Sequence, residues 1–130
     1  MFRGYCYKAV FSAATWQAAR ENCKNLRDDS DLPSIHSKAE DDFIFSVLGP
    51  ETTDGKVGWI GYSDSEGKKQ WTWVDGHSDE TNPYANWNKD EPNDDYKPNC
   101  AQLGSEGKWN ANECTINLPF MCKVGLNLFL

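Results

Sequence analysis

The sequence predicts an α+β domain, with two helices in its first half and several short strands in its second half. Two observations favour this class. Apolar residues recur at spacings of three and four only before residue 50, and the later strand-like segments are short and rich in Trp and Val. A chain of 130 residues is the usual size of one domain with its own core. Helices followed by a run of strands are typical of the α+β class.

The chain begins with a predicted strand and a predicted helix. Residues 5–11 combine aromatic and β-branched side chains, which is typical of a strand. A helix over about 13–25 follows, and Ser12 is its expected N-cap. The apolar face of this helix consists of Trp16, Ala19, Cys23 and Leu26.

A second helix is predicted over about 38–48. Ser37 and Glu40 have the spacing of a capping box at its start, and Gly49-Pro50 is expected to end it. Its apolar face consists of Phe43, Ile44, Val47 and Leu48.

The second half is predicted to consist of strands and one long loop. The loop, about 75–99, is polar and contains Tyr84, Trp87 and Tyr96, which favour an ordered segment; loops this long are usually functional or disordered. The alternating leucines of 126–130 are expected to extend the last strand or to pair with the first. Strands are predicted at 57–61, 70–74, 100–103 and 120–124. The tryptophans expected in the core are Trp59, Trp71, Trp73 and Trp109.

Composition excludes several classes of protein. Thirteen basic and 20 acidic residues give a net charge of −7, which argues against a nucleic-acid partner because phosphates require a basic surface. No stretch approaches the ~20 apolar residues of a membrane span. The N-terminus lacks the apolar core of a signal peptide, so we expect Met1 to begin an expressed or mature fragment.

Five cysteines indicate an oxidising compartment. Their wide spacing, without a Cys-x-x-Cys pair, does not fit a zinc finger, so a disulfide framework is favoured over five reduced cysteines in a cytosolic protein. Five cysteines form two bridges and leave one thiol, and their positions alone leave the connectivity open. They are Cys6, Cys23, Cys100, Cys114 and Cys122.

An acidic segment within the long loop is the candidate for chemistry. Residues 90–95 read Asp-Glu-Pro-Asn-Asp-Asp, and four carboxylates held together in an ordered loop repel one another unless a cation binds. Carboxylate and amide oxygens suit Ca²⁺, although composition alone favours a solvated acidic turn. A glycosidase needs two carboxylates across a cleft, and Glu91 with Asp94 has no signal of such a pocket, so we do not expect an enzyme.

One set of motifs occurs in order along almost the whole chain, from Tyr5 to Lys123. The set consists of Cys6-Tyr7, Trp16…Ala19…Cys23, Leu32-Pro33-Ser34-Ile35-His36-Ser37…Glu40…Phe43, Trp59-Ile60-Gly61, Trp87…Glu91-Pro92-Asn93, Trp109-Asn110 and the cysteines at 100, 114 and 122. This ordered set resembles the C-type lectin-like domain. The resemblance implies a double-loop α+β fold with two helices, two small antiparallel sheets and a long ligand-binding loop. It also implies that residues 1–130 form a single domain from a longer extracellular protein, either secreted or the ectodomain of a cell-surface protein.

The same resemblance implies a disulfide pairing. It pairs Cys23 with Cys122 and Cys100 with Cys114. Cys6 matches the second cysteine of an optional N-terminal hairpin and is therefore expected to be unpaired here, or paired with another molecule.

For function, the resemblance implies calcium-dependent binding of mannose-type sugars through their equatorial 3- and 4-hydroxyls. The carbohydrate-binding residues would be Glu91, Asn93 and Asn110, with a cis peptide bond before Pro92. The Ca²⁺ ligands would be Glu91, Asn93 and Asn110, completed by Asp94, Asp95 and the Ala111 carbonyl. The partners implied are glycans or a glycoprotein.

Two departures from the family pattern weaken the expected calcium site. Ala111 stands where the family has Asp, and Pro98 stands where it usually has an acidic ligand. An auxiliary Ca²⁺ site would draw on Asp64, Glu66 and Asp94. The alternative function is a protein-recognition module on the same fold that binds calcium weakly or not at all.

Overall fold

The computed structural model describes residues 4–51, 56–64, 71–76, 84–92, 99–104 and 106–125. Within them, two α-helices and a six-stranded sheet give an α+β fold, which confirms the predicted class. The elements are β1 (Tyr5–Ala14), α1 (Trp16–Leu26), α2 (Lys38–Leu48), a 3-10 turn (Gly49–Glu51), β2 (Lys56–Ser63), β3 (Thr72–Trp73), β4 (Asn99–Gly104), β5 (Trp109–Glu113) and β6 (Leu118–Gly125).

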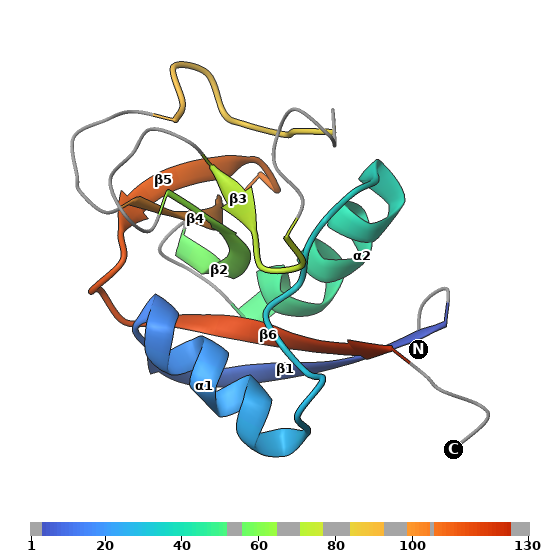
Figure 1. The fold of residues 1–130 in the computed structure, drawn as a ribbon. Helices are drawn as coiled ribbons and strands as arrows, with labels where there is room; N and C mark the ends of the chain where they lie inside the picture. The colour runs from blue at the N-terminus through green and yellow to red at the C-terminus, as the bar shows by residue number, and fades with distance from the viewer. Residues whose placement is uncertain are drawn as a thin grey trace.

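The sheet has two antiparallel parts joined by one parallel contact. The strand order is β1-β6-β2-β4-β5, and β3 pairs with β2 beside this path. Only the pair Trp59↔Phe120 links β2 to β6, in parallel orientation. Figure 1 shows the long β1–β6 pair below, with α1 against it, and the shorter strands with α2 above. The two antiparallel sheets that the resemblance implies are therefore present as parts of one mixed sheet.

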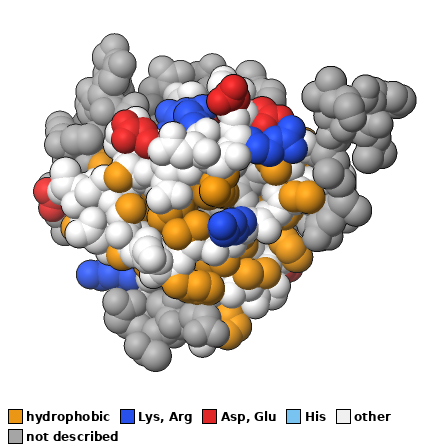
Figure 2. Space-filling model, turned by 90° about the horizontal axis from the view of Figure 1, so that it is seen from below, with side chains coloured by type: hydrophobic (Ala, Val, Ile, Leu, Met, Phe, Trp, Pro, Cys, Tyr) orange, Lys and Arg blue, Asp and Glu red, His pale blue; other side chains and the backbone are white. Residues whose placement is uncertain are grey.

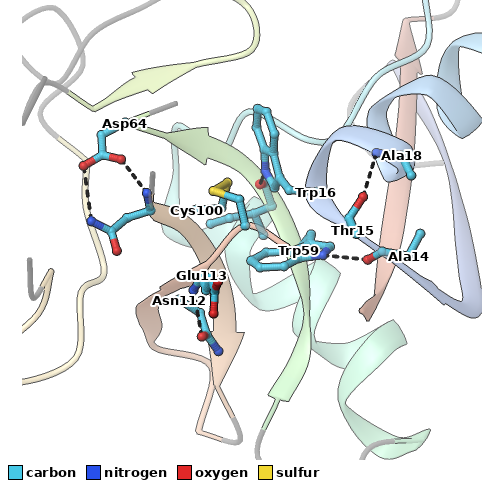
Figure 3. The surroundings of a disulfide bond; sticks show 12 residues. Ala14, Thr15, Trp16, Ala18, Trp59, Asp64, Cys100, Asn112 and Glu113 are labelled. Atoms are coloured by element: carbon cyan, nitrogen blue, oxygen red, sulfur yellow. Dashed lines mark hydrogen bonds between the residues drawn. A yellow bond between two sulfur atoms is a disulfide. The ribbon is translucent and has the colours of Figure 1, made fainter. Parts of the chain in front are cut away.

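Helix α1 begins three residues later than the sequence predicts. Ser12 is not the N-cap, because β1 continues to Ala14, which pairs with Leu118 of β6. The indole of Trp59 donates to the Ala14 carbonyl at 2.9 Å and holds this end of the strand (Figure 3). Thr15 caps the helix instead, and its Oγ1 accepts a bond from the Ala18 N–H at 3.2 Å.

Helix α2 has the predicted bounds and the predicted cap. Ser37 Oγ accepts a bond from the Glu40 N–H at 3.2 Å. The Glu40 carboxylate bonds distant groups: it accepts from the Tyr7 hydroxyl at 2.6 Å and pairs with the Lys123 ammonium at 2.5 Å. Helix α2 is thus fastened to both β1 and β6.

The remaining strands are found where they are predicted, with one addition. β2, β4 and β6 cover the predicted segments 57–61, 100–103 and 120–124, β3 is limited to Thr72–Trp73 of the predicted 70–74, and β5 was not predicted. β6 ends at Gly125, and the leucines of 126–130 lie outside the described residues.

Two disulfides tie the parts together. Cys23–Cys122 joins α1 to β6 across a sequence separation of 99, a loop closure worth about 4–5 kcal/mol. Cys100–Cys114 joins β4 to the turn after β5. These are the pairs that the resemblance implies, and Cys6 is a free, half-buried thiol on β1.

The tryptophans form the centre of the core. Trp59, Trp73 and Trp109 have 0–2% of their surface exposed, and Trp71 has 6% exposed. They lie in two neighbouring clusters, one below the 84–92 segment and one around α1 and β6. The prediction that these residues are structural is confirmed.

The lower side of the molecule carries β1, β6 and α1. Figure 2 shows this side, where apolar side chains gather with basic ones among them. Neither α1 nor α2, the helices of the described part, is long and apolar enough to cross a membrane. The 84–92 segment lies on the opposite, upper side, above β5 (Figure 1).

Candidate functional site

The outer edge of β5 is where the site is built. β4 and β5 pair antiparallel from Asn99↔Glu113 to Leu103↔Trp109. In such a pair, alternate residues direct their N–H and C=O groups away from the partner strand. Trp109 and Ala111 are two of these residues, so their backbone groups are available to another segment.

The 84–92 segment hydrogen-bonds both backbone groups of Trp109. The Trp109 N–H donates to the Asn86 carbonyl at 2.8 Å, and the Asn88 N–H donates to the Trp109 carbonyl at 2.8 Å. Trp87 and Trp109 form a parallel bridge. Residues 86–88 therefore behave as a short extra strand along β5.

Glu91 continues this ladder with its side chain. The Glu91 N–H donates to the Asn88 carbonyl at 3.1 Å, which closes a turn that includes Asp90 at a φ of 66°. Beyond the turn, Glu91 Oε1 accepts a bond from the Ala111 N–H at 2.8 Å. This carboxylate oxygen thus takes the position that a main-chain carbonyl would have in a neighbouring strand. The next peptide bond, Glu91–Pro92, is cis.

Asn110 lies beside this contact on the other face of β5. Successive side chains alternate along a strand, so Asn110 points away from the core that receives Trp109 and Ala111. Its side chain is half-buried and makes no hydrogen bond among the described residues. Of the predicted site residues, the structure brings Glu91 into contact with Ala111, whose neighbour in β5 is Asn110, while Asn93, Asp94 and Asp95 lie outside the described residues.

A buried carboxylate on α2 holds the same region from below. Asp41 is 1% exposed and accepts bonds from the Tyr84 hydroxyl at 2.9 Å, the Asn86 amide at 2.9 Å and the Trp109 indole at 3.2 Å. Burial raises the pKa of Asp41, and these three hydrogen bonds offset part of the rise. The Asn86 amide also donates to the Gly107 carbonyl at 2.9 Å.

The sequence-based prediction missed Asp41. The signal that could have found it is its spacing, because Asp41, Ile44 and Leu48 lie on the buried face of α2. An acidic residue on such a face needs partners, and a search for them would have led to the polar and aromatic loop.

An aromatic layer supports the segment. Trp87 packs edge-on against Trp71 at 4.8 Å between ring centroids and against Trp109 at 5.8 Å. Tyr62 stacks on Trp73 at 4.1 Å beneath them. Trp87 therefore packs beneath the segment from which Glu91 projects.

Comparison with known proteins decides the family. Residues 12–124 match the family model of the Lectin C-type domain. The chain belongs to the C-type lectin domain family. C-type mannose receptor 2 of Homo sapiens is 34% identical over 125 residues, which are 94% of this chain and 8% of the receptor.

Solved structures agree with the family. Human lithostathine has a TM-score of 0.83 at 29% identity, covering 96% of this chain and 95% of that one. A calcium-independent type II antifreeze protein has a TM-score of 0.79 at 26% identity, covering 96% of this chain and 89% of the other. This C-type lectin domain thus shares its fold with proteins of different activity.

The oxygen donors of this lectin domain suit calcium, but they carry little charge. The Glu91 carboxylate, the Asn110 amide and the outward-facing Ala111 carbonyl are hard oxygens, the type that Ca²⁺ binds. Ala111 itself is 6% exposed, with its methyl group in the core. No group of three or more His, Cys, Asp or Glu side chains suited to a metal occurs in the described ranges. The donor types fit Ca²⁺, and Asp94 and Asp95, which were expected to add charge, lie outside the described residues.

The auxiliary calcium site has one described member. Asp64 is 3% exposed, and its Oδ1 accepts a bond from the Asn99 backbone N–H at 2.6 Å (Figure 3). Its Oδ2 accepts a bond from the Asn99 side-chain amide at 3.3 Å. Both oxygens therefore already have partners within the protein, whereas Glu66 and Asp94 lie outside the described residues.

A cavity of about 270 Å³ lies elsewhere, between the end of α1 and β6. Most of its charged groups bond one another or nearby residues. Asp31 pairs with Arg20 at 2.8 Å and Lys24 at 3.3 Å, and Lys123 pairs with Glu40 at 2.5 Å. Nearby, His36 Nε2 hydrogen-bonds the Asp75 carboxylate at 2.5 Å. These pairs link α1, α2 and β6, so we assign them a structural role.

Proposed function

We propose that this domain binds mannose-type sugars in a calcium-dependent manner, and that its task is recognition and not catalysis. The observation that carries the proposal is the 2.8 Å bond between Glu91 Oε1 and the Ala111 N–H. It places the first residue of the Glu-Pro-Asn motif against the strand that carries Asn110. Two residues about twenty positions apart in the sequence thus meet at one edge of the sheet.

The ligands would be the Glu91 carboxylate, the Asn93 and Asn110 amides and the Ala111 carbonyl, with Asp94 or Asp95 adding charge. Bound Ca²⁺ would supply coordination positions for two vicinal sugar hydroxyls, as the resemblance implies. Asn110 has an amide that makes no hydrogen bond among the described residues. This amide and the Glu91 carboxylate would orient the sugar hydroxyls by hydrogen bonds.

We expect calcium binding to be weak. Affinity depends on the number and charge of the ligands, and Ala111 and Pro98 each replace a carboxylate. The dissociation constant then falls in the ~10⁻⁴–10⁻³ M range of extracellular modules. Carboxylates must be ionised to coordinate, so affinity should decrease as the pH falls towards about 4.

The test is a Ca²⁺ titration by calorimetry together with mannan binding in Ca²⁺ and in EDTA. Glu91→Gln should weaken Ca²⁺ binding by roughly tenfold or more, because it removes a charged ligand. It should leave the fold intact, since Gln retains an oxygen for the Ala111 N–H. Glu113→Gln, which alters an exposed carboxylate at the end of β5, is the matched control and should leave binding unchanged.

A second candidate function is recognition of a protein ligand with little or no calcium. The buried methyl group of Ala111 favours it, because the family's acidic ligand is absent there. The structural similarity to a calcium-independent antifreeze protein is consistent with this alternative. Equal mannan binding in EDTA and in Ca²⁺, or no mannan binding and no heat of calcium binding, would favour it over the sugar site.

We further propose that the domain works outside the cell as part of a longer protein, with a glycan or glycoprotein as its partner. Its two disulfides suit an oxidising compartment. The chain spans 8% of the length of C-type mannose receptor 2. Non-reducing mass spectrometry of the protein from its natural source would test both the compartment and the size of the parent chain.

A further inference from the structure

We propose that Asp41 is the positioning residue that holds the 84–92 segment, and with it the Glu91 carboxylate, in register against β5. The proposal rests on the proposed function only in treating Glu91 as a binding residue. The positioning itself is a property of the fold and can be measured without any ligand.

One carboxylate bonds both sides of the junction. Oδ2 of Asp41 accepts from Tyr84 and Asn86, which belong to the segment. Oδ1 accepts from the indole of Trp109, which belongs to β5. Because Asp41 is 1% exposed on α2, water cannot readily replace these partners, and the helix fixes the position of the carboxylate.

A continuous series of hydrogen bonds leads from this carboxylate to Glu91. The two residues that Asp41 holds, Asn86 and Trp109, are joined by the bond from the Trp109 N–H to the Asn86 carbonyl. Next come the bond from the Asn88 N–H to the Trp109 carbonyl and the bond from the Glu91 N–H to the Asn88 carbonyl. The last bond joins Glu91 Oε1 to the Ala111 N–H. A slip of one residue at Asn86 would move Glu91 away from β5.

The aromatic packing on the segment does not by itself set the register. Packing of Trp87 on Trp71 and Trp109 buries apolar surface, but the hydrophobic effect is non-directional. Hydrogen bonds to a fixed carboxylate are directional and stronger than neutral ones. Asp41 therefore supplies directional bonds that fix the register, which the aromatic layer does not supply.

The substitution Asp41→Asn preserves shape and exposes this role. An Asn side chain offers one oxygen and one amide donor at the two positions. If its oxygen faces Tyr84 and Asn86, its amide opposes the Trp109 indole donor. If the oxygen faces Trp109, its amide opposes the Asn86 donor. Either orientation leaves two donors facing each other at the junction.

The experiment is amide hydrogen exchange by NMR on the unliganded protein. In Asp41→Asn, the Ala111 amide should exchange about tenfold faster, the factor given by about 1.4 kcal/mol for one lost hydrogen bond. The indole resonance of Trp109 should shift. The reference is the Lys123 amide, which bonds the Asp31 carbonyl at 2.8 Å on the far side of the sheet and should change less.

Two further variants keep the result decisive. Asp42→Asn alters the exposed neighbour that pairs with Lys38 at 2.7 Å, and should leave the Ala111 amide unchanged. Tyr84→Phe removes one donor and retains the carboxylate, so it should give a smaller change of the same kind even if Asp41→Asn fails to fold.

The outcomes separate this proposal from the sugar site. If amide exchange accelerates equally at Ala111 and Lys123, Asp41 contributes only global stability. If exchange at Ala111 does not accelerate in Asp41→Asn or in Tyr84→Phe, Asp41 does not position Glu91. Either result overturns the proposal. If Ala111 accelerates selectively but the wild type does not bind mannan, the positioning stands and the sugar function fails. If both hold, Asp41→Asn should also weaken mannan binding.

Discussion

Replacing Ala111 by Asp is the most informative single change, because it restores the missing acidic ligand at a buried position. Ala111 is 6% exposed, and its methyl group packs in the core cluster under the 84–92 segment. Its own N–H already bonds a carboxylate oxygen of Glu91 at 2.8 Å. Without a cation, the new side chain brings a second negative charge to an apolar site beside the first.

The structure sets the size of the effect. An uncompensated buried charge lowers the free energy of unfolding by about 3–5 kcal/mol. The Asp side chain can turn partly towards solvent at the edge of β5, so we expect a loss of about 2–4 kcal/mol in EDTA. With calcium at 100 times its dissociation constant, binding restores about 2.7 kcal/mol. Ala111→Asp should thus be less stable than wild type in EDTA and regain most of the loss in calcium, with tighter Ca²⁺ and mannan binding.

The assay is urea unfolding at pH 7 and at pH 4, each in EDTA and in Ca²⁺. Burial raises the pKa of the new carboxyl above its unfolded value, so its cost is largest above the raised pKa and disappears near pH 4. Ala111→Asn has similar size without charge, and should show little dependence on calcium or pH. If Ala111→Asp is equally stable in EDTA and calcium and its Ca²⁺ affinity equals that of wild type, the calcium site is not at β5.

Two further predictions follow from local contacts. Thr15→Ala should lower the free energy of unfolding by about 1 kcal/mol through loss of the cap, whereas Ser12→Ala should change it by less than about 0.5 kcal/mol. Urea unfolding measures both changes, and equal effects would contradict the assignment of the cap to Thr15. Burial raises the pKa of Asp41, so in the folded protein it takes up its proton at a higher pH than in the unfolded chain. This proton uptake offsets part of the acid destabilisation just above pH 4. The free energy of unfolding should therefore fall more steeply with decreasing pH in Asp41→Asn than in wild type, and parallel pH profiles would contradict a raised pKa of Asp41.

The sequence predicts the strand tryptophans and the bounds of α2 well because local signals and tertiary packing agree there, although Val47 of the predicted apolar face is 37% exposed. Ser37 caps α2 as its spacing predicts, and the strand tryptophans are buried. The start of α1 was wrong because Ser12 and Thr15 are both good N-caps. The choice between them is made by pairing of Ala14 with β6, which a local pattern does not contain.

Strand β5 was missed for a similar reason. Its sequence, Trp-Asn-Ala-Asn-Glu, lacks β-branched residues, and its conformation comes from β4 on one side and 86–88 on the other. The proximity of Glu91 to β5, seen in its bond with Ala111, was suggested only by resemblance to a family, since nothing local links positions twenty residues apart. Asp41 escaped notice because its role appears only once its three partners are assembled.

Docking on β5 and ligand binding depend on different parts of the 84–92 segment. Main-chain bonds at Asn86 and Asn88 dock the segment, and the Asn86 side chain is held in addition by Asp41 and the Gly107 carbonyl. At Glu91 the contact passes to a side chain, which substitution can change without disturbing the docking. A binding surface arranged in this way can vary its ligand preference over generations while its scaffold is inherited unchanged.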